Sequence, residues 1–289
     1  MQEIIEAIKQ SVLKIKQSFD NPEYGYTELS NASGDLQLKQ DVLSDMIITN
    51  ELSKIGSIKA IISEEKENPQ FLYDDAKYIV AYDPLDGSSL FDVNFAVGSI
   101  FAIYENTAEP NSLKAAIYSI YGPRTQLVVC INEPKLYEYD GKEFKFLKDL
   151  KLNEKGKLNA TGGTQKDWSK AHKAMIDKIF SDGYRLRYSG AMVSDLHQIL
   201  IKGGGLFSYP NTSEATLNDG KLGKLRALFE VFPFAYIYEK AGGFSSDGIK
   251  GSKGYESLLN LKFSTIHAST PCYLGSISEK AYLDEYLWE

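Results

Sequence analysis

Two aspartates follow an apolar stretch of the sequence at a spacing suited to holding a cation. The run Tyr78–Tyr82 has the composition of a buried strand, and Asp83 and Asp86 come directly after it. Two carboxylates this close repel each other unless a cation lies between them. The residue types therefore point to a metal site at a strand end, although a surface turn with solvated aspartates has the same composition.

The residues that follow the second aspartate suit a phosphate group. Gly87 permits a tight turn, and Ser88 and Ser89 add two hydroxyls to the backbone N–H groups of that turn. Such groups donate hydrogen bonds to phosphate oxygens. A cation and a phosphate bound side by side would indicate chemistry on a phosphorylated substrate.

A second pair of acids stands after another extended apolar run. Ile58–Ser63 is followed by Glu64 and Glu65, and the alternative interpretation is a solvated charge run. If the two strand ends converge, their carboxylates form a hard-oxygen site of the kind that Mg²⁺ prefers.

Composition excludes several other functions. The 289 residues hold 3 His and 2 Cys, too few for a zinc site or a disulfide framework. A net charge of −7 argues against a nucleic-acid binder. No apolar run reaches the roughly 18–20 residues that span a bilayer, and charged residues interrupt the amphipathic N-terminus, which is therefore not a signal peptide. Cys130 is expected in the core and Cys272 in a loop, and both suit a reducing cytoplasm.

Hydrophobic periodicity indicates an α/β protein with mixed sheets flanked by helices. Asp140-Gly141 is a hairpin turn signal, and the polar stretch Lys148–Asn159 suggests two halves, 1–155 and 156–289. Helices are expected at the N-terminus and near residues 38–55, 169–180, 191–202, 233–241 and 278–288. Further extended runs are expected at Phe95–Tyr104, Ala115–Tyr118, Gln126–Ile131 and Phe263–Ile266.

Five sequence motifs occur together in one order along the chain. DPLDGSS follows the apolar strand and SEE lies upstream; Gly34-Asp35 and Asp41-Val42-Leu43-Ser44 precede them, and Gly183–His197 and Lys224–Gly243 follow. This pattern resembles the lithium-sensitive sugar phosphatase superfamily and, through Ser88-Ser89, its class I fructose-1,6-bisphosphatase family. The resemblance implies a layered α/β/α/β/α sandwich, a homotetramer, and Mg²⁺-dependent hydrolysis of fructose 1,6-bisphosphate to fructose 6-phosphate in gluconeogenesis, with Mn²⁺ or Zn²⁺ as other possible metals. The alternatives are a sedoheptulose-1,7-bisphosphatase, an inositol monophosphatase-like enzyme, or a sugar-phosphate-binding regulator without catalysis.

The same resemblance assigns roles to individual residues. Asp41 and Glu65 are expected to orient and deprotonate the attacking water. The implied metal ligands are Asp35, Glu64, Asp83, Asp86, Glu230 and the backbone carbonyl of Leu85. Burial supports the assignment of Glu230, because an unpaired carboxylate among the apolar residues of ALFEVFPFAY would be costly.

The resemblance also implies substrate contacts in both predicted halves of the chain. Asp86, Gly87, Ser88 and Ser89 would hold the 1-phosphate and the sugar. The sugar and its 6-phosphate would be held by Tyr188, Tyr209, Lys224 and, from a neighbouring subunit, Arg187. With 19 Tyr in the chain, packing is the alternative for the tyrosines, and solvation is the alternative for the two cations.

The chain departs from the family pattern in two places that affect ligands. Glu105 stands where a family arginine would bind the phosphate of AMP, and the N-terminal arm of AMP-regulated members is missing, so we expect no AMP inhibition through the family's usual site. Thr161 and Thr164 replace an Asn and a Tyr that hold the 6-phosphate, which keeps sedoheptulose 1,7-bisphosphate as a second substrate. His172, His197 and His267 are interpreted as structural.

Overall fold

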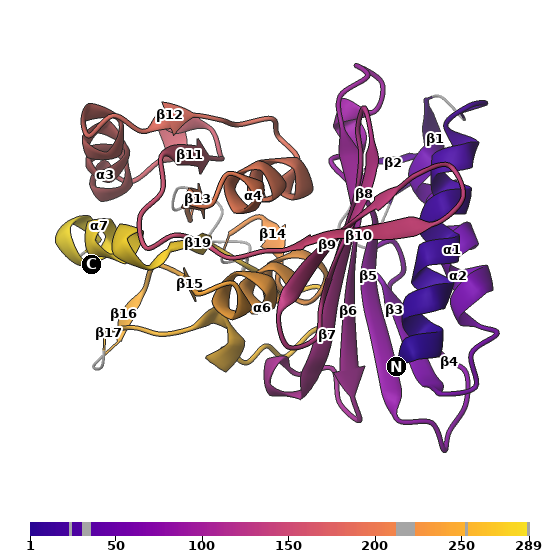
Figure 1. Ribbon diagram of the computed structural model, residues 1–289. Coiled ribbons are helices and arrows are strands. Elements are labelled where there is room, and N and C mark those ends of the chain that lie inside the picture. Colours follow the sequence, from indigo (N-terminus) through magenta and orange to yellow (C-terminus); the bar gives the residue numbers. More distant parts are fainter. Residues whose placement is uncertain (23–24, 31–35, 212–222, 252–253, 288–289) are drawn as a thin grey trace. The chain divides into compact units, whose positions relative to one another are not determined.

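In the computed structural model the chain forms two compact units, each with its own sheet (Figure 1). The structure describes residues 1–22, 25–30, 36–211, 223–251 and 254–287. The first unit comprises Met1–Ile131, Lys135–Lys148 and Ala191–Val193, and the second comprises Asn132–Pro134, Asp149–Gly190 and Ser194–Glu289.

Among the described residues, the first unit holds an eight-stranded sheet in the order β10-β9-β8-β7-β6-β5-β3-β4. β5 to β8 pair antiparallel, whereas β3 and β5 pair in parallel. Parallel pairing brings the carboxyl ends of β3 and β5 to the same edge of the sheet. The strands are β3 Ile58–Ser63, β4 Gln70–Phe71, β5 Tyr78–Asp86, β6 Val97–Glu105, β7 Leu113–Tyr121, β8 Thr125–Cys130, β9 Pro134–Tyr139 and β10 Phe144–Asp149.

Two helices, α1 (Gln2–Ser18) and α2 (Lys39–Leu52), cover one face of this sheet (Figure 1). The apolar residues of α1 recur every three or four positions, so that Ile4, Ile8 and Val12 are fully buried against the sheet and α2. Each such side chain contributes about 2 kcal/mol by leaving water. A small ribbon of β1 (Tyr26–Ser30) and β2 (Leu36–Leu38) precedes α2.

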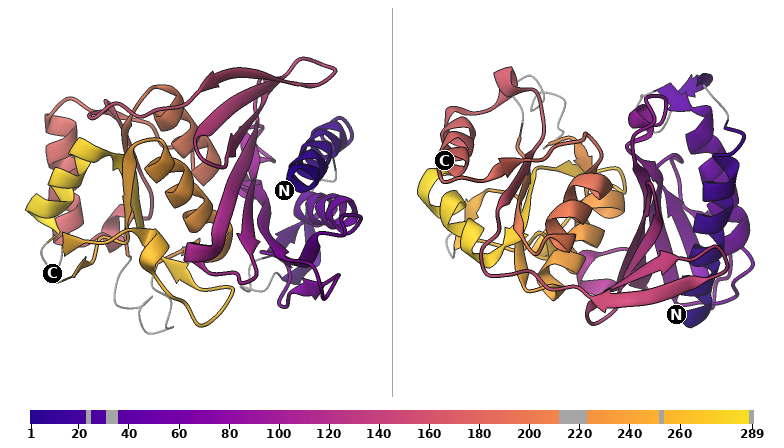
Figure 2. Two further views of the ribbon diagram at one scale, coloured as in Figure 1. Left: turned by 60° about the horizontal axis from the view of Figure 1, so that its bottom comes forward. Right: turned by 45° about the horizontal axis from the view of Figure 1, so that its top comes forward.

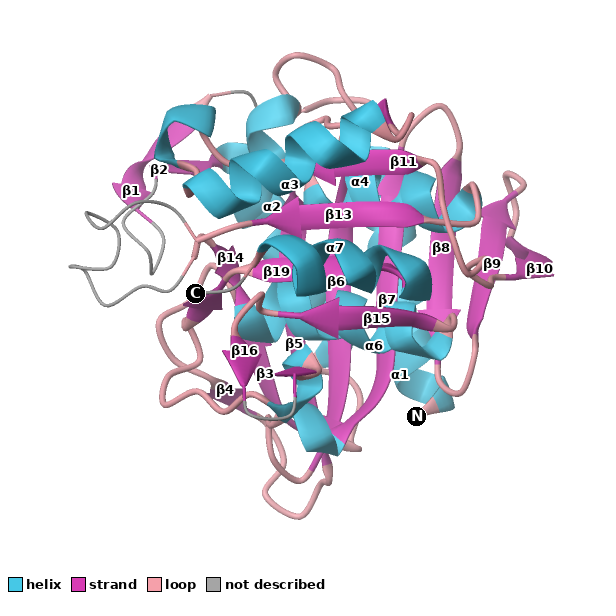
Figure 3. Ribbon diagram, turned by 90° about the vertical axis from the view of Figure 1, so that its left-hand side faces the viewer, coloured by secondary structure: helices cyan, strands magenta, loops and turns pink. Residues whose placement is uncertain are grey.

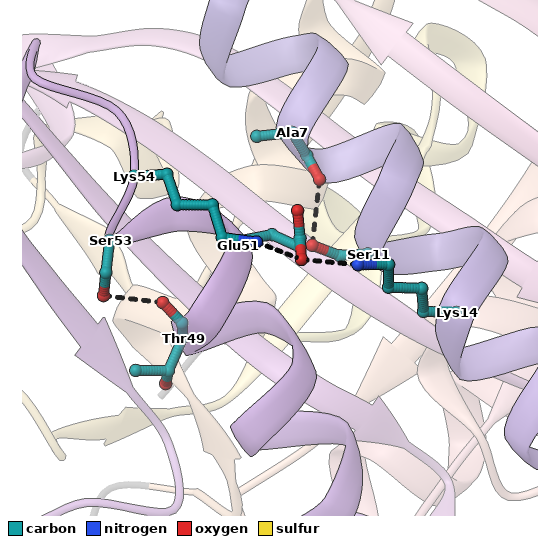
Figure 4. A network of polar contacts seen from close by, with 7 residues as sticks. All are labelled: Ala7, Ser11, Lys14, Thr49, Glu51, Ser53 and Lys54. Atoms are coloured by element: carbon teal, nitrogen blue, oxygen red, sulfur yellow. Dashed lines mark hydrogen bonds and ion pairs between the residues drawn. The ribbon is translucent and has the colours of Figure 1, made fainter.

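An ion-pair network joins the two helices at the far end of α2 (Figure 4). One carboxylate oxygen of Glu51 accepts from Lys14 of α1 at 2.6 Å and from Lys54 at 2.7 Å. These contacts lower the pKa of Glu51, because hydrogen bonds from two cations favour its charged form. Both lysines are about half exposed, so the network adds little to stability.

The second unit is built on a mixed sheet in the order β12-β11-β13-β19-β15 (Figure 3). β11 pairs in parallel with β12 and β13, and β19 runs antiparallel to β13 and β15. Helices α3 and α7 cover one face and α4 and α6 the other, as Figures 1 and 2 show. The elements are β11 Leu158–Thr161, α3 Lys170–Ser181, β12 Arg185–Leu186, α4 Met192–Ile201, β13 Gly205–Tyr209, α6 Phe232–Lys240, β15 Gly243–Ser246, β19 Cys272–Ser276 and α7 Lys280–Tyr286.

The fold class predicted from the sequence is confirmed. One unit supplies a helical layer and a sheet, and the other supplies a sheet between two helical layers, all with mixed strand directions. The Asp140-Gly141 turn joins β9 and β10 as expected. Two further short pairs complete the described strands. β14 (Leu225–Arg226) pairs with β18 (Ser269–Thr270), and β16 (Lys250–Gly251) pairs with β17 (Gly254–Tyr255).

Two local expectations were wrong. Phe263–Ile266 is not a strand but an irregular stretch before β18, because these residues have no ladder partner among the described residues. Cys272 lies not in a loop but at the start of β19, where it is fully buried opposite Tyr209. Pro271 before it can stand at the margin of a strand, which the sequence pattern did not reveal.

A buried chain of hydrogen bonds crosses the second unit. The Ser208 hydroxyl donates to Thr161 Oγ1 at 3.0 Å, and Thr161 Oγ1 lies 3.1 Å from Nε2 of His172. Nδ1 of His172 lies 3.2 Å from the Tyr273 hydroxyl, and the imidazole ring makes a T-shaped contact with the ring of Trp168. Burial lowers the pKa of His172 from 6.5 to about 3, so the ring is neutral and structural.

Replacing His172 by glutamine is expected to flatten the acid dependence of stability. Below pH 6.5 the unfolded chain protonates this histidine, whereas the folded chain does not until about pH 3. The stability that neutral His172 contributes is therefore complete above pH 6.5 and is lost as the pH falls toward 3. Between pH 7 and pH 5 the parent should lose about 2 kcal/mol more than the variant in urea unfolding. Equal losses in both proteins would contradict this assignment.

Candidate active site

The predicted convergence of two strand ends occurs within the first unit. β3 and β5 run in parallel with Ser63 opposite Tyr82, so Glu64 and Glu65 follow one strand where Asp83 follows Tyr82 on the other. The amide of Glu64 donates to the carbonyl of Tyr82 at 3.0 Å, which fixes the first residue after β3 to β5. The sheet itself therefore gathers the carboxylates at one edge.

Asp83 and Asp86 are both buried and lie close together. They are 6% and 7% exposed, and a carboxylate oxygen of one lies within 4.8 Å of one of the other. Each is held by a backbone amide: Leu85 donates to Asp83 at 2.9 Å, and Val193 donates to Asp86 at 2.7 Å. Since two buried negative charges at this distance repel, a hard divalent cation fits this donor set.

Asp41 stands in the first turn of α2 and interacts with Glu65. It is 5% exposed, and its carboxylate accepts from the amide of Leu38 at 3.2 Å. Burial and then the negative charge of Glu65 raise its pKa to about 8, although hydrogen bonds from Leu38 and from the Ser88 hydroxyl act in the other direction. The structure thus brings together the two residues expected to handle the water proton.

The turn after Asp86 has room only for glycine. Gly87 has φ +76°, and a side chain there would meet the Cβ of Ala191 at 2.3 Å. This turn leads into a short 3-10 helix over Ser88–Leu90, in which both predicted phosphate-binding serines lie. Close packing of the Gly87 backbone against Ala191 therefore holds the turn that leads into Ser88 and Ser89.

Within the second unit, Tyr188 and Tyr209 meet over Gly162. A side chain on Gly162 would touch the ring of Tyr209 at 2.4 Å and the hydroxyl of Tyr188 at 3.1 Å. Burial raises the pKa of Tyr209 to about 12, with smaller contributions from Tyr188 and Glu230. The Tyr209 hydroxyl is thus a neutral donor at physiological pH, as binding an anionic group requires.

Glu230 and Lys224 belong to the same cluster of the second unit. Glu230 lies in a π-helical turn, Ala227–Val231, and its carboxylate accepts from the amide of Arg226 at 2.5 Å. Burial raises its pKa to about 7, while Arg226 and Lys224 lower it. Such turns are frequent at functional sites because they redirect one side chain out of the helical pattern.

Three predicted site residues remain, namely Asp35, Leu85 and Arg187. Asp35 lies outside the described residues. The Leu85 side chain is buried, and its amide holds Asp83. Arg187 is exposed, and its guanidinium donates to the carbonyl of Leu186 at 2.8 Å.

Two family models together match nearly the whole chain. The model described as fructose-1-6-bisphosphatase, N-terminal domain, matches residues 1–148, and that of the C-terminal domain matches residues 152–287. Fructose-1,6-bisphosphatase class 1 of Campylobacter jejuni is 58% identical over 277 residues, which cover 96% of this chain and 95% of the relative. The Campylobacter concisus protein of that name is 53% identical over 99% of this chain and 98% of its own. The chain belongs to the class 1 fructose-1,6-bisphosphatase family.

Solved structures agree with this assignment. The Leishmania major fructose-1,6-bisphosphatase in holo form matches with a TM-score of 0.88 and 29% identity, covering 98% of this chain and 93% of that one. A putative sedoheptulose-1,7 bisphosphatase from Toxoplasma gondii matches with a TM-score of 0.87 and 27% identity, covering 99% and 93%. The family and the phosphatase activity predicted from the motifs are thereby confirmed. No helix in the described part of the chain has the length and apolar character needed to cross a membrane.

Two buried acids that were not predicted from the sequence, Asp195 and Asp45, lie close to predicted site residues of their own unit. Asp195 of α4 is fully buried and accepts from the amides of Ser189 and Gly190, just after Tyr188. Its position in the first turn of a helix was a readable capping signal. Asp45, one turn after Asp41 on α2, is 5% exposed, and nothing in its spacing distinguished it from a solvated residue.

Mg²⁺ is expected to stabilise the folded chain through the buried aspartates. A ligand that binds only the folded state stabilises it by about 2.7 kcal/mol at a hundredfold excess over its Kd. Asp83→Asn should lose most of this gain, whereas Asp177→Asn, at an exposed carboxylate of α3, should keep it. Thermal unfolding with MgCl₂ and with NaCl at equal ionic strength measures the difference, and the same gain in both variants would sink the metal assignment.

Proposed function

We propose that the chain removes the 1-phosphate of fructose 1,6-bisphosphate, releasing fructose 6-phosphate for gluconeogenesis, with water activated by a divalent metal ion. The observation that carries the proposal is the group of acids at the ends of β3 and β5. Asp83 and Asp86 are buried there, Glu64 and Glu65 follow the neighbouring strand, and Asp41 interacts with Glu65. Family membership supports the substrate assignment.

Mg²⁺ is the metal that we assign, with Mn²⁺ and Zn²⁺ as alternatives. Glu64, Asp83, Asp86, Glu230 and the Leu85 carbonyl are the proposed ligands, and Asp35 would serve a further, weaker position. Their oxygens match the preference of Mg²⁺ for hard donors. When bound, the metal would lower the pKa of a water and neutralise charge on the phosphoryl oxygens and on the departing oxygen.

Asp41 and Glu65 are the proposed proton acceptors. Burial, and then the negative charge of Glu65, raises the pKa of Asp41 to about 8, which would make the Asp41 carboxylate a stronger acceptor for a proton of the attacking water. The water oxygen then forms a bond to phosphorus while the bond from phosphorus to the sugar oxygen breaks. The sugar oxygen leaves with the electron pair and takes up a proton.

The substrate would be held at both of its phosphates. The amides and hydroxyls from Gly87 to Ser89 suit the reacting phosphate, and the Ser88 hydroxyl already bonds to Asp41. The distant phosphate and the sugar would be held by Tyr188, Tyr209 and Lys224, with Arg187 acting across a homotetramer interface. These contacts orient the substrate without taking part in bond breaking.

One observation favours sedoheptulose 1,7-bisphosphate as a second substrate. Thr161 stands where family members grip the 6-phosphate, yet its hydroxyl is buried and bonded to Ser208 and His172. A distant phosphate held by fewer side chains leaves the length of the sugar less strictly defined.

A cytoplasmic location also belongs to the proposal, because Cys130 and Cys272 are both free thiols.

Phosphate release from three substrates tests this function. With Mg²⁺, we expect the fastest release from fructose 1,6-bisphosphate, slower release from sedoheptulose 1,7-bisphosphate, and little from inositol 1-phosphate. Asp83→Asn should reduce kcat by roughly a thousandfold, because it removes a charge that holds the metal, and EDTA should abolish activity of the parent.

Three outcomes would contradict the proposal. A fully active Asp83→Asn variant would remove the metal role, and preference for inositol 1-phosphate would remove the substrate assignment. Binding of fructose 1,6-bisphosphate without any phosphate release would instead indicate a non-catalytic regulator.

AMP is not expected to inhibit the enzyme at the family's usual site. Glu105 pairs with Lys77 at 2.8 Å and with Lys114 at 3.4 Å, so its negative charge would repel a nucleotide phosphate from these lysines. Steady-state assays with AMP should show no cooperative inhibition in the parent. Glu105→Arg should introduce weak AMP binding, whereas cooperative inhibition of the unmodified enzyme would refute the expectation.

A further inference from the structure

Helix α2 presents two carboxylates, one turn apart, to the segment that follows β3. Asp41 and Asp45 are four residues apart and therefore lie on the same side of the helix. Asp41 interacts with Glu65, a residue of like charge, whereas Asp45 forms an ion pair with the next residue along, Lys66. An attractive contact thus stands directly beside a repulsive one.

Lys66 is anchored by more than one partner. Its ammonium lies 2.8 Å from Asp45 Oδ2 and donates to Thr49 Oγ1 at 2.9 Å. The Tyr82 hydroxyl donates to Asp45 Oδ1 at 2.7 Å and lies 2.9 Å from Thr49 Oγ1, which closes a four-residue ring of hydrogen bonds. Tyr82 is fully buried and Asp45 nearly so, whereas the Lys66 side chain is 38% exposed, so the buried acid and its hydrogen bond from Tyr82 fix where the ammonium binds.

This ring is joined covalently to one proposed proton acceptor, Glu65, and to one proposed metal ligand, Asp83. Lys66 follows Glu65, and Tyr82 precedes Asp83. Backbone contacts tighten the connection, since Glu65 donates to the Ser63 hydroxyl at 3.2 Å and Lys66 donates to the Ser63 carbonyl at the same distance. A shift of Lys66 would therefore move the Glu65 carboxylate with it.

We propose that the ion pair between Lys66 and Asp45 is a positioning device that holds Glu65 beside Asp41 against their mutual repulsion, ready to receive a divalent cation. Lys66 acts through Glu65 and is a positioning residue. The inference rests on the proposed function and names a determinant of metal affinity within the same site. Without the pair, Glu65 and Asp41 would move apart, and the cation would have to reassemble the acids when it binds.

Variants at both ends of the pair test the proposal. Lys66→Met, Asp45→Asn and the double variant would be compared with Lys66→Arg, which keeps the charge. Glu51→Gln is the matched control, because it breaks an ion pair of the same helix at its opposite end (Figure 4). For each protein, kcat, KM for fructose 1,6-bisphosphate and the Mg²⁺ concentration for half-maximal activity are measured, and calorimetry gives the Kd of Mg²⁺ alone.

The expected result is a loss of metal affinity and kcat with KM nearly unchanged. Displacing a reacting group by about 1 Å can cost a hundredfold in rate, so kcat should fall roughly ten- to hundredfold in Lys66→Met and Asp45→Asn. The Kd of Mg²⁺ should rise several-fold, by roughly the amount expected when an outer-shell partner is lost. The double variant should be no worse than either single one, and Lys66→Arg and Glu51→Gln should resemble the parent.

Several outcomes would overturn the inference. An unchanged Kd for Mg²⁺ in a folded Lys66→Met variant would do so, as would a change confined to KM, which would instead make Lys66 a substrate contact. Additive losses in the double variant would show that the two residues act separately. If the parent releases no phosphate from fructose 1,6-bisphosphate, the proposed function fails, and the calorimetric Kd values still decide whether Lys66 and Asp45 position the acids.

Discussion

Mutual repulsion between buried carboxylates is the constraint on which the first unit depends. The parallel pairing of β3 with β5 brings acids from two strand ends to one edge of the sheet, and burial weakens the screening of their charges by water. Backbone amides offset part of this cost by donating to Asp83 and Asp86. A site assembled this way favours a divalent cation because such an ion removes the remaining repulsion.

The same constraint explains why rigid elements surround these acids. Asp41 belongs to a helix whose apolar side packs on the sheet, and the Gly87 turn packs against Ala191 without room for a side chain. Neither element can relax easily to let the charges separate. Packing of these two elements thus opposes part of the repulsion among the acids.

In the second unit, the predicted site residues are mainly neutral hydroxyl groups and cations rather than clustered carboxylates. Its tyrosines contribute neutral hydroxyls, and burial keeps Tyr209 protonated by raising its pKa to about 12. Glu230 is buried in a π-helical turn, where the amide of Arg226 and nearby cations partly compensate its charge. Neutral donors and a few cations are suited to holding an anion without strong dependence on pH near neutrality.

The sequence by itself determined the chemistry and most of the elements. Apolar runs predicted β3 and the first part of β5, and the acids that follow these runs, Glu64 and Asp83, pointed to a cation, since local composition fixes which groups a strand end offers. Short irregular stretches such as Phe263–Ile266 were misjudged, because a strand exists only where a partner supplies its ladder. Only the tertiary structure decided that β3 and β5 pair in parallel, that Glu65 faces Asp41, and that Asp45 meets Lys66. These contacts join residues distant in sequence, and packing of the whole unit, rather than spacing along the chain, sets their distances.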